Sequence, residues 1–354
     1  MSRSRAVAPQ GHSPMTPRTF PPVEVTFSPA WWHVKHGMDF SEGAWLDPIR
    51  RTELDRERRR LLHERFGDVG LGEQDPPPRP NVEAYGHRFM AALYGCEIRY
   101  LPDQDPAAVA LPDAAAKMSR LRVRDIAESP VVRRAFAEAA ALRERYGSCD
   151  GSINLGGPLN NAVSVSGEEI LAACLADPPL ARRTLQTMAE ALLLVHDLVM
   201  CRINGQEVTS PRPGWGIGNC PVCMISPETY REVVLPVDQW LRAQFRDFGL
   251  HHCGVFHPYA DVYAELGPSS LDVGWGSDLG RVREVFPHTP MSLMIEASAL
   301  VAKSGAELDA LVARTAEAAA PLELVTKLWV AEIGPDVPDE TVQTLVTAPA
   351  AMMR

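Results

Sequence analysis

The stretch that decides the fold is LHHCGVFHPYADVYAELGPSSLDVG, residues 250–274. It begins with a short strand-like run that ends in two histidines and a cysteine. It continues through a helical pattern at 259–266 and ends in a second short apolar run at 270–274. A strand, a helix and a second strand in this order favour parallel pairing through a right-handed crossover. The same alternation extends along the chain in both directions.

Other short apolar runs predict strands, and helical patterns separate them. A first strand is expected at VEVTF, from Val23, and others at 97–101, 152–155, 214–219, 250–253, 292–296 and 322–330. Helices are expected at 47–66, 131–146, 167–175, 179–204, 227–248, 279–286, 305–319 and 339–346. This pattern favours a closed (β/α)8 TIM barrel with an N-terminal helical extension, forming a single domain over 23–354. Gly156-Gly157-Pro158 lacks a third glycine and is a poor match to a dinucleotide phosphate loop.

The composition argues against a disordered chain, a nucleic-acid or membrane-binding protein and a secreted disulfide scaffold. The 354 residues have a net charge of −10, and 45% of them are hydrophobic, which is typical of a soluble globular protein. The negative charge argues against nucleic acid or an anionic membrane as a partner. Seven cysteines, an odd number, indicate reduced thiols in the cytoplasm rather than a secreted disulfide scaffold. Residues 1–22 lack the apolar segment of a secretory signal, and we expect a disordered tail there.

In a barrel of this kind, functional side chains lie at the carboxyl ends of the strands. The residues that occupy these positions here include Cys220, Cys223, His251, Cys253, Asp278, Glu296 and Glu332. His251 and Cys253 are two positions apart, so both side chains can point to the same face of a strand. Mixed nitrogen and sulfur ligands suit Zn²⁺. The alternative is a buried free cysteine beside a hydrogen-bonded histidine.

The sequence Cys220-Pro221-Val222-Cys223 adds a second set of thiols directly after a predicted strand. Its spacing can deliver two thiolates to one tetrahedral ion, although a redox pair or two packing thiols have the same spacing. A redox motif should open a long helix, whereas the next helix begins only at 227, so this pair lies in a loop. We therefore predict a shared Zn²⁺ site with ligands drawn from Cys220, Cys223, His251 and Cys253.

The segments ISPETY (225–230) and VLP (234–236), followed one helix later by LHHCG (250–254), resemble motifs of the uroporphyrinogen decarboxylase superfamily. The His-x-Cys-Gly form is similar to the zinc-dependent methyltransferase branch, which transfers methyl groups between corrinoid proteins and thiols such as coenzyme M. The resemblance covers roughly residues 150–345 and implies a (β/α)8 barrel. It also implies a Zn²⁺ cofactor that activates a small thiol or methyl-donor substrate.

The chain departs from this superfamily in two places. The "RQAGRY" and "FSD" segments of uroporphyrinogen decarboxylase itself are absent, which argues against porphyrinogen decarboxylation. The methyltransferase branch also takes a zinc cysteine from near the carboxyl terminus, before a stretch that 333–342 resembles, but no cysteine follows Cys253. Cys220 or Cys223 is the expected replacement, and Glu332 or Glu296 is the oxygen alternative.

The resemblance implies a metal-dependent methyltransferase in which the metal holds a substrate thiol as the attacking thiolate. Asp278 could orient or deprotonate the substrate, or cap the helix that begins at Leu279. Glu332 could be a ligand or a base, or pair with Lys327. A corrinoid partner would be a separate protein, since the chain has no DxHxxG-type motif. The alternatives are a metal-independent decarboxylase or lyase acting on a small carboxylate, and a non-catalytic metal-binding protein.

Overall fold

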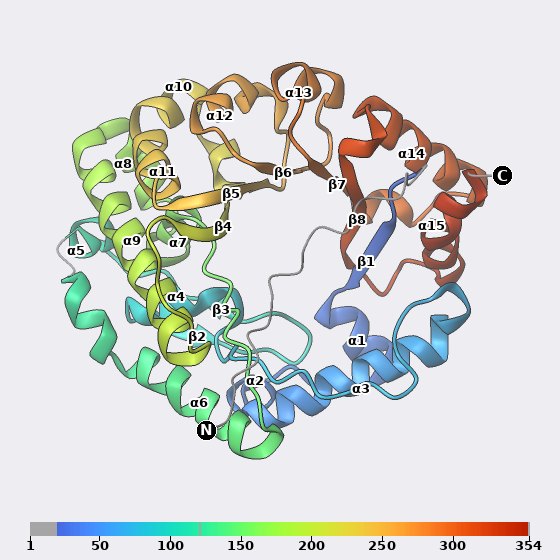
Figure 1. Ribbon diagram of the computed structural model, residues 1–354, viewed down its shortest axis with the longest axis horizontal. Coiled ribbons are helices and arrows are strands. Elements are labelled where there is room, and N and C mark those ends of the chain that lie inside the picture. Colours follow the sequence, from blue (N-terminus) through green and yellow to red (C-terminus); the bar gives the residue numbers. More distant parts are fainter. Residues whose placement is uncertain (1–19, 120–121, 353–354) are drawn as a thin grey trace, which may run out of the picture.

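Six parallel strands form one curled sheet in the computed structural model, which describes residues 20–119 and 122–352. The strand order is β1-β8-β7-β6-β5-β4, and helices lie around the outside of the sheet (Figure 1). The predicted tail falls outside the described residues up to position 19. The strands are β1 (Val23–Phe27), β4 (Arg212–Gly218), β5 (Phe245–His252), β6 (Ser270–Val273), β7 (Met291–Ile295) and β8 (Val325–Ile333).

Helices connect and cover these strands. They are α1 (Pro29–His36), α2 (Glu42–Leu46), α3 (Pro48–Phe66), α4 (Phe89–Leu93), α5 (Ala114–Met118), α6 (Pro130–Tyr146), α7 (Pro158–Ser166), α8 (Glu169–Ala176), α9 (Pro178–Leu198), α10 (Pro227–Thr229), α11 (Leu235–Arg242), α12 (Ala260–Leu266), α13 (Leu279–Val285), α14 (Gly305–Ala318) and α15 (Asp339–Met352). From β4 onward, strands and helices alternate as the sequence predicts. The helix predicted at 227–248 is shorter, because β5 already begins at Phe245.

The sheet does not close into the predicted eight-stranded barrel. Its edges are β1 and β4, and in the described part of the chain the arc between them has a single parallel bridge, from Asn81 to Asp150, where two strands were expected. The segment 152–155 is irregular. The segment 97–101 contributes only β2 (Ile98–Arg99), which pairs antiparallel with β3 (Ala107–Ala108) outside the main sheet. The architecture is therefore barrel-like, with an arc of helices and loops between β1 and β4 (Figure 1).

The two glycines before α7 allow this arc to approach the sheet edge. Gly156 has a φ of +61°, a left-handed conformation that favours glycine. A Cβ on Gly157 would lie 2.4 Å from the backbone oxygen of Gly218, at the end of β4. The Gly-Gly-Pro sequence is thus explained by a close contact between α7 and β4.

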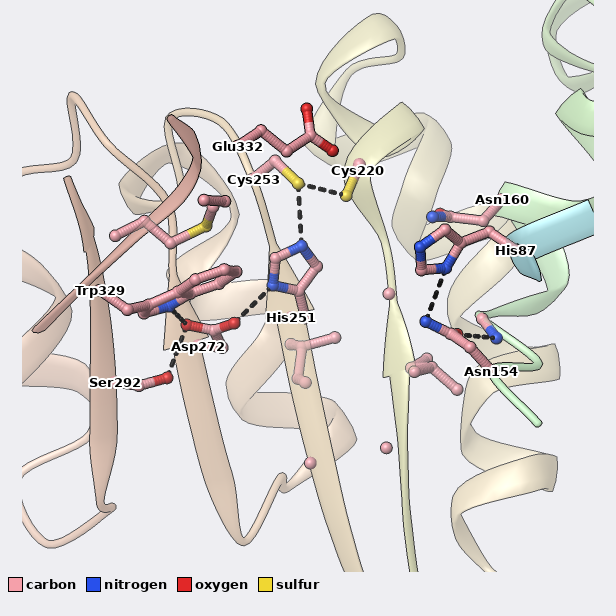
Figure 2. A pocket seen from close by; sticks show the side chains of 18 of the residues that line it. His87, Asn154, Asn160, Cys220, His251, Cys253, Asp272, Ser292, Trp329 and Glu332 are labelled. Carbon is pink, nitrogen blue, oxygen red and sulfur yellow. Dashed lines mark hydrogen bonds and ion pairs between the residues drawn. The ribbon is translucent and has the colours of Figure 1, made fainter. Parts of the chain in front are cut away.

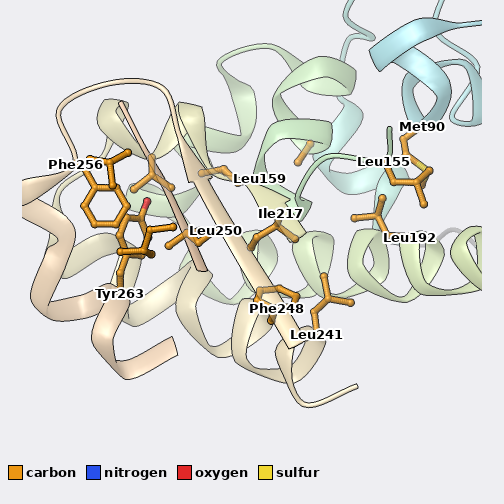
Figure 3. Close-up of a cluster of buried hydrophobic side chains, with 14 of the residues drawn as sticks. Met90, Leu155, Leu159, Leu192, Ile217, Leu241, Phe248, Leu250, Phe256 and Tyr263 are labelled. Carbon is orange, nitrogen blue, oxygen red and sulfur yellow. The ribbon is translucent and has the colours of Figure 1, made fainter. Parts of the chain in front are cut away.

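Strand β5 shows how alternation separates the core from the interior of the sheet. Phe248, Leu250 and His252 are buried, while Gly249 and His251 lie at the alternate positions and line the central cavity. The buried side chains between β4, β5 and the covering helices form part of the hydrophobic core. Figure 3 labels Leu159, Ile217, Leu241, Phe248, Leu250, Phe256 and Tyr263 in this layer.

Helix α9 and its continuation, Pro178–Ile203, form one helical segment of 26 residues that is long and apolar enough to span a membrane by composition. Core helices of soluble proteins share this property, and α9 packs against α7, α8 and α11. The segment agrees within one residue at each end with the helix predicted at 179–204.

The arginine-rich helix α3 has the charge pattern expected of a solvated face. Four of its arginines pair with acidic side chains of the same helix or of the following loop. These pairs are Arg56–Glu53, Arg58–Asp55, Arg59–Asp55, Arg59–Glu73, Arg60–Glu57 and Arg60–Glu64.

Candidate metal centre and active-site cavity

The curled sheet encloses a cavity of about 1210 Å³. Many interior positions of the strands carry very small side chains, including Gly216, Gly218, Gly249, Ser270 and Ser292. In a closed (β/α)8 barrel, bulky branched residues usually fill this space. The small residues leave room for a ligand inside the sheet, and the polar groups on the walls determine what that ligand can be.

Two thiols and an imidazole meet at the carboxyl ends of β4 and β5 (Figure 2). Cys220 lies on a 3-10 turn directly after β4, His251 lies in β5, and Cys253 follows β5. The Cys220 and Cys253 Sγ atoms are 2.8 Å apart, and His251 Nε2 is 2.8 Å from Cys253 Sγ. The parallel pairing of Gly218 with His251 places these residues side by side.

A half-buried carboxylate orients the imidazole. Asp272, in the middle of β6, accepts a hydrogen bond from His251 Nδ1 at 2.7 Å, and its other oxygen accepts hydrogen bonds from Ser292 Oγ at 2.6 Å and Trp329 Nε1 at 2.7 Å. Nε2 of His251 is therefore directed at the sulfurs. Asp272 was not among the predicted site residues, although an acidic residue between the apolar Leu271 and Val273 of a strand was a usable signal.

These contacts shift the pKa values within the cluster. The hydrogen bond from the Cys253 thiol lowers the pKa of Cys220 to about 4, and the pKa of Cys253 is raised because Cys253 holds the shared proton. Burial alone would lower the pKa of His251, but its hydrogen bonds to Asp272 and the Cys220 sulfur raise the pKa to about 9. The cluster therefore favours a Cys220 thiolate beside a His251 imidazolium. A bound cation could displace the proton on His251 Nε2 and the proton on the Cys253 thiol.

The donor set fits a metal ion. One ligand atom from each of Cys220, His251 and Cys253 lies within 4.8 Å of the others, so the three residues could hold one ion. Two sulfurs and one nitrogen suit Zn²⁺, and three protein ligands leave a fourth position for a substrate. A carboxylate on the remote nitrogen of a ligating histidine is a common feature of zinc sites, as Asp272 is here.

His252 has a different environment from its neighbour. Its side chain is fully buried on the opposite face of β5, and its Nδ1 lies 2.8 Å from the Tyr263 hydroxyl. Burial lowers the pKa of His252 to about 4, so this imidazole is neutral. The alternation of the strand thus separates the two histidines of the His-His-Cys sequence.

The remaining predicted ligands lie outside this cluster. Cys223 is exposed, and its thiol donates a hydrogen bond to the Cys220 backbone oxygen at 3.1 Å. Glu296 lines the cavity and accepts a hydrogen bond from Ser298 at 2.6 Å. Glu332 also lines the cavity, near Cys253 in Figure 2, with an uncommon positive φ of 57°.

Asp278 has the capping position that the sequence analysis gave as its alternative role. Its Oδ1 accepts a hydrogen bond from the Arg281 backbone N–H at 3.0 Å, at the start of α13. Asp278 is exposed and is not among the residues that line the cavity.

We expect Asp278→Ala to lower the free energy of unfolding by about 1 kcal/mol, because the first turn of α13 loses its cap. Metal binding should be unchanged. Urea denaturation and metal titration measure the two quantities. Asp261→Ala is the matched control, since it removes a neighbouring carboxylate that pairs with Arg281 but caps no helix. A loss of metal affinity in the Asp278 variant alone would contradict the capping role.

A buried polar network holds the segment that carries Cys220. Asn219 donates its backbone N–H to the His251 carbonyl oxygen at 2.8 Å and its Nδ2 to Asp238 Oδ2 at 2.9 Å. The Tyr230 hydroxyl donates to the same Asp238 oxygen at 2.8 Å. The network therefore ties the turn after β4 to both β5 and α11. The sequence analysis did not identify Asp238.

We expect Asp238 to make stability depend on pH. Burial raises its pKa from 3.8 to about 6, against the opposing hydrogen bonds from Asn219 and Tyr230. The native protein therefore binds the carboxyl proton of Asp238 more strongly than the unfolded chain does. Ionisation of Asp238 thus lowers the free energy of unfolding as the pH rises from about 4 through 6. Relative to Asp238→Asn, wild-type unfolding free energy should fall by roughly 2–3 kcal/mol between pH 4 and 7. Denaturation of both proteins at both pH values tests this, and a constant difference would refute it.

Comparison with known proteins supports the fold. No family model matches the sequence, and no curated protein does. Among solved structures, a methyltransferase from Methanosarcina mazei matches 95% of this chain and 94% of its own chain, with a TM-score of 0.64 and 18% sequence identity. A B12-independent methionine synthase from Shewanella sp. W3-18-1 matches 94% of this chain and 96% of its own chain, with a TM-score of 0.44 and 12% sequence identity. The chain thus shares the fold of the first protein over nearly its whole length.

Proposed function

We propose that this protein is a zinc-dependent methyltransferase that transfers a methyl group between a donor and a small thiol in the cytoplasm. The observation that carries the proposal is the convergence of Cys220, His251 and Cys253 at the strand ends of an open cavity. Three ligands with a free fourth position suit a metal that exchanges substrates. The shared fold with the Methanosarcina mazei methyltransferase and the sequence resemblance described above agree with this assignment.

The chain's own residues would orient the reacting thiol. Cys220, His251 and Cys253 would hold the metal, which when bound lowers the pKa of the substrate thiol and favours its thiolate. Asp272 keeps the His251 ring in place. Glu332, whose charge contributes to raising the pKa of Cys253, lies where its carboxylate could accept the thiol proton.

The transfer itself is a displacement at carbon. The substrate sulfur attacks the methyl group and forms the carbon–sulfur bond, while the bond between the methyl group and its donor breaks and leaves its electron pair on the donor. We propose a methylated corrinoid carried by a separate protein as the donor. That partner would dock over the opening of the cavity.

Methyl transfer from free methylcobalamin to 3-mercaptopropionate tests the proposal with defined probes. Zinc-loaded protein should form the S-methyl thioether, detected by mass spectrometry, and Cys253→Ala should not. Cys223→Ala is the control, because its thiol lies outside the cluster. Zinc-loaded wild-type protein without thioether formation, or equal rates in the Cys253 variant, would overturn the proposal.

A further inference from the structure

Polar side chains on the inner face of the sheet form a row of hydrogen bonds that ends at the proposed metal ligand His251. Asp272 of β6 pairs in register with His251 of β5, and Ser292 of β7 pairs with Asp272. These three residues therefore lie at one level of the cavity wall (Figure 2). Bulky branched side chains usually fill such positions in a closed barrel. A polar row at this level is therefore a candidate for a role beyond packing.

Trp329 joins the row from a strand that is not adjacent to β6. It lies in β8, pairs in register with Met294 of β7, and lines the same cavity. Two strand spacings, about 10 Å, separate β8 from β6. The indole passes β7 near the small side chain of Ser292, and its Nε1 donates a hydrogen bond to Asp272 Oδ1 at 2.7 Å (Figure 2). The long side chain of Trp329 thus reaches a carboxylate two strands away.

The two oxygens of Asp272 serve different partners. Oδ1 accepts hydrogen bonds from Ser292 Oγ at 2.6 Å and from the indole of Trp329, while Oδ2 lies 2.7 Å from His251 Nδ1. The terminal torsion of an aspartate has only a broad intrinsic preference, so its own side chain does not fix the carboxylate plane. Two donors on Oδ1 fix this plane and keep Oδ2 aimed at the imidazole.

The indole of Trp329 is held in turn by a side chain of its own strand. The Lys327 ammonium lies 5.7 Å from the centroid of the Trp329 ring, a distance typical of a cation–π contact. The same ammonium pairs with Glu24 of β1 at 2.6 Å. The row of contacts therefore runs from β1 through Trp329 and Asp272 to His251.

We infer that Trp329 is a positioning residue for the metal centre. Its indole N–H holds the Asp272 carboxylate, and this carboxylate holds the His251 ring with Nε2 directed at the sulfurs. The inference rests on the metal-binding part of the proposed function and does not depend on methyl transfer. Direct partners of a ligating histidine change metal affinity by about 10- to 100-fold. Trp329 acts one contact further from the metal, so we expect its effect at the lower end of this range.

A double-mutant cycle on zinc affinity tests whether Trp329 acts through Asp272. Trp329→Phe should weaken zinc binding by about 10-fold, measured by competition with a chelator. In an Asp272→Ala background, the same substitution should have no further effect, because the carboxylate that the indole positions is gone. Trp275→Phe is the matched control. Trp275 also lines the cavity, but it is not among the described donors to Asp272, so its loss should leave zinc affinity unchanged.

Nitrogen-15 NMR of the tryptophan side chains adds a measurement that a packing role would not affect. Zinc titration of the wild-type protein should shift the indole N–H resonance of Trp329, identified by its absence in Trp329→Phe. The shift is expected because metal binding at His251 changes the hydrogen bond between His251 and Asp272, and the indole shares that carboxylate. The resonance of Trp275 should not move, and in Asp272→Ala the resonance of Trp329 should lose its response.

Two results of the cycle would overturn the inference. Unchanged zinc affinity in Trp329→Phe would show that the indole does not support the site, and an equal loss in both backgrounds would show that it acts through packing. A zinc titration that shifts no indole resonance of the wild-type protein would also overturn it, even if Trp329→Phe does not fold. Wild-type protein that binds no zinc would instead contradict the proposed function, and the inference would fall with it.

Discussion

Cys220→Ala and Cys253→Ala are each expected to abolish stoichiometric zinc binding. Both sulfurs belong to the only cluster of three metal-ligating side chains found in the described part of the chain. Changes to residues that merely orient a ligand already weaken metal binding by about 10- to 100-fold. Loss of a thiolate ligand should therefore weaken it by more than about 100-fold. Elemental analysis of the purified proteins, followed by competition with a chelator, measures this loss.

Cys223→Ala provides a sharp control for these variants. It removes a thiol from the same turn, three residues from Cys220, but the Cys223 thiol points to a backbone oxygen instead of the cluster. Its zinc content should equal that of the wild-type protein, at about one ion per chain. Zinc loss in Cys223→Ala that matches the loss in Cys220→Ala would show that both thiols of the CxxC sequence bind the ion.

Gly274→Ala is expected to destroy the site through the backbone. A Cβ at this position would lie 2.2 Å from the carbonyl carbon and oxygen of Cys253 and 2.4 Å from the Gly254 oxygen. These atoms are backbone, so the turn that positions the Cys253 thiol must move. We expect the free energy of unfolding to fall by at least about 3 kcal/mol, the upper part of the usual cost of overpacking. Zinc affinity should fall as well.

Gly305→Ala is the matched substitution for this test. At the start of α14, the nearest atom to the added methyl would be a Thr344 methyl carbon at 3.9 Å, an ordinary contact. Stability should be unchanged or slightly higher, because alanine favours helix more than glycine does. Calorimetry and zinc titration of the two variants give the comparison. Wild-type stability in Gly274→Ala would show that the turn after β5 is not tightly packed against β6.

The sequence predicted the part of the fold in which apolar residues recur with the period of a strand or a helix. The runs at 214–219, 270–274 and 292–296 are strands in the structure within a residue or two, and alternation along β5 explains why His251 and Cys253 meet. The segment 152–155 has the composition of a strand but does not pair in the sheet. The nearest β-bridge is a single one at Asp150, which pairs with Asn81. Whether such a run pairs depends on neighbours far away in the sequence, which local patterns do not encode.

The candidate site shows the same limit. A spacing of two residues was enough to pair His251 with Cys253, but choosing Cys220 over Cys223 required the orientation of the turn after β4. Asp272 and Asp238 were missed because each is a single acidic residue whose role depends on partners in other elements.

X-ray absorption at the zinc edge, with and without 3-mercaptopropionate, tests the central claim most directly. The account predicts a zinc ion with two sulfur ligands and at least one nitrogen ligand in the protein alone, and a third sulfur ligand when the thiol is added. A metal shell that the thiol leaves unchanged, closed by four protein ligands, would contradict it. Such a result would indicate a structural metal site instead of a site that activates a substrate.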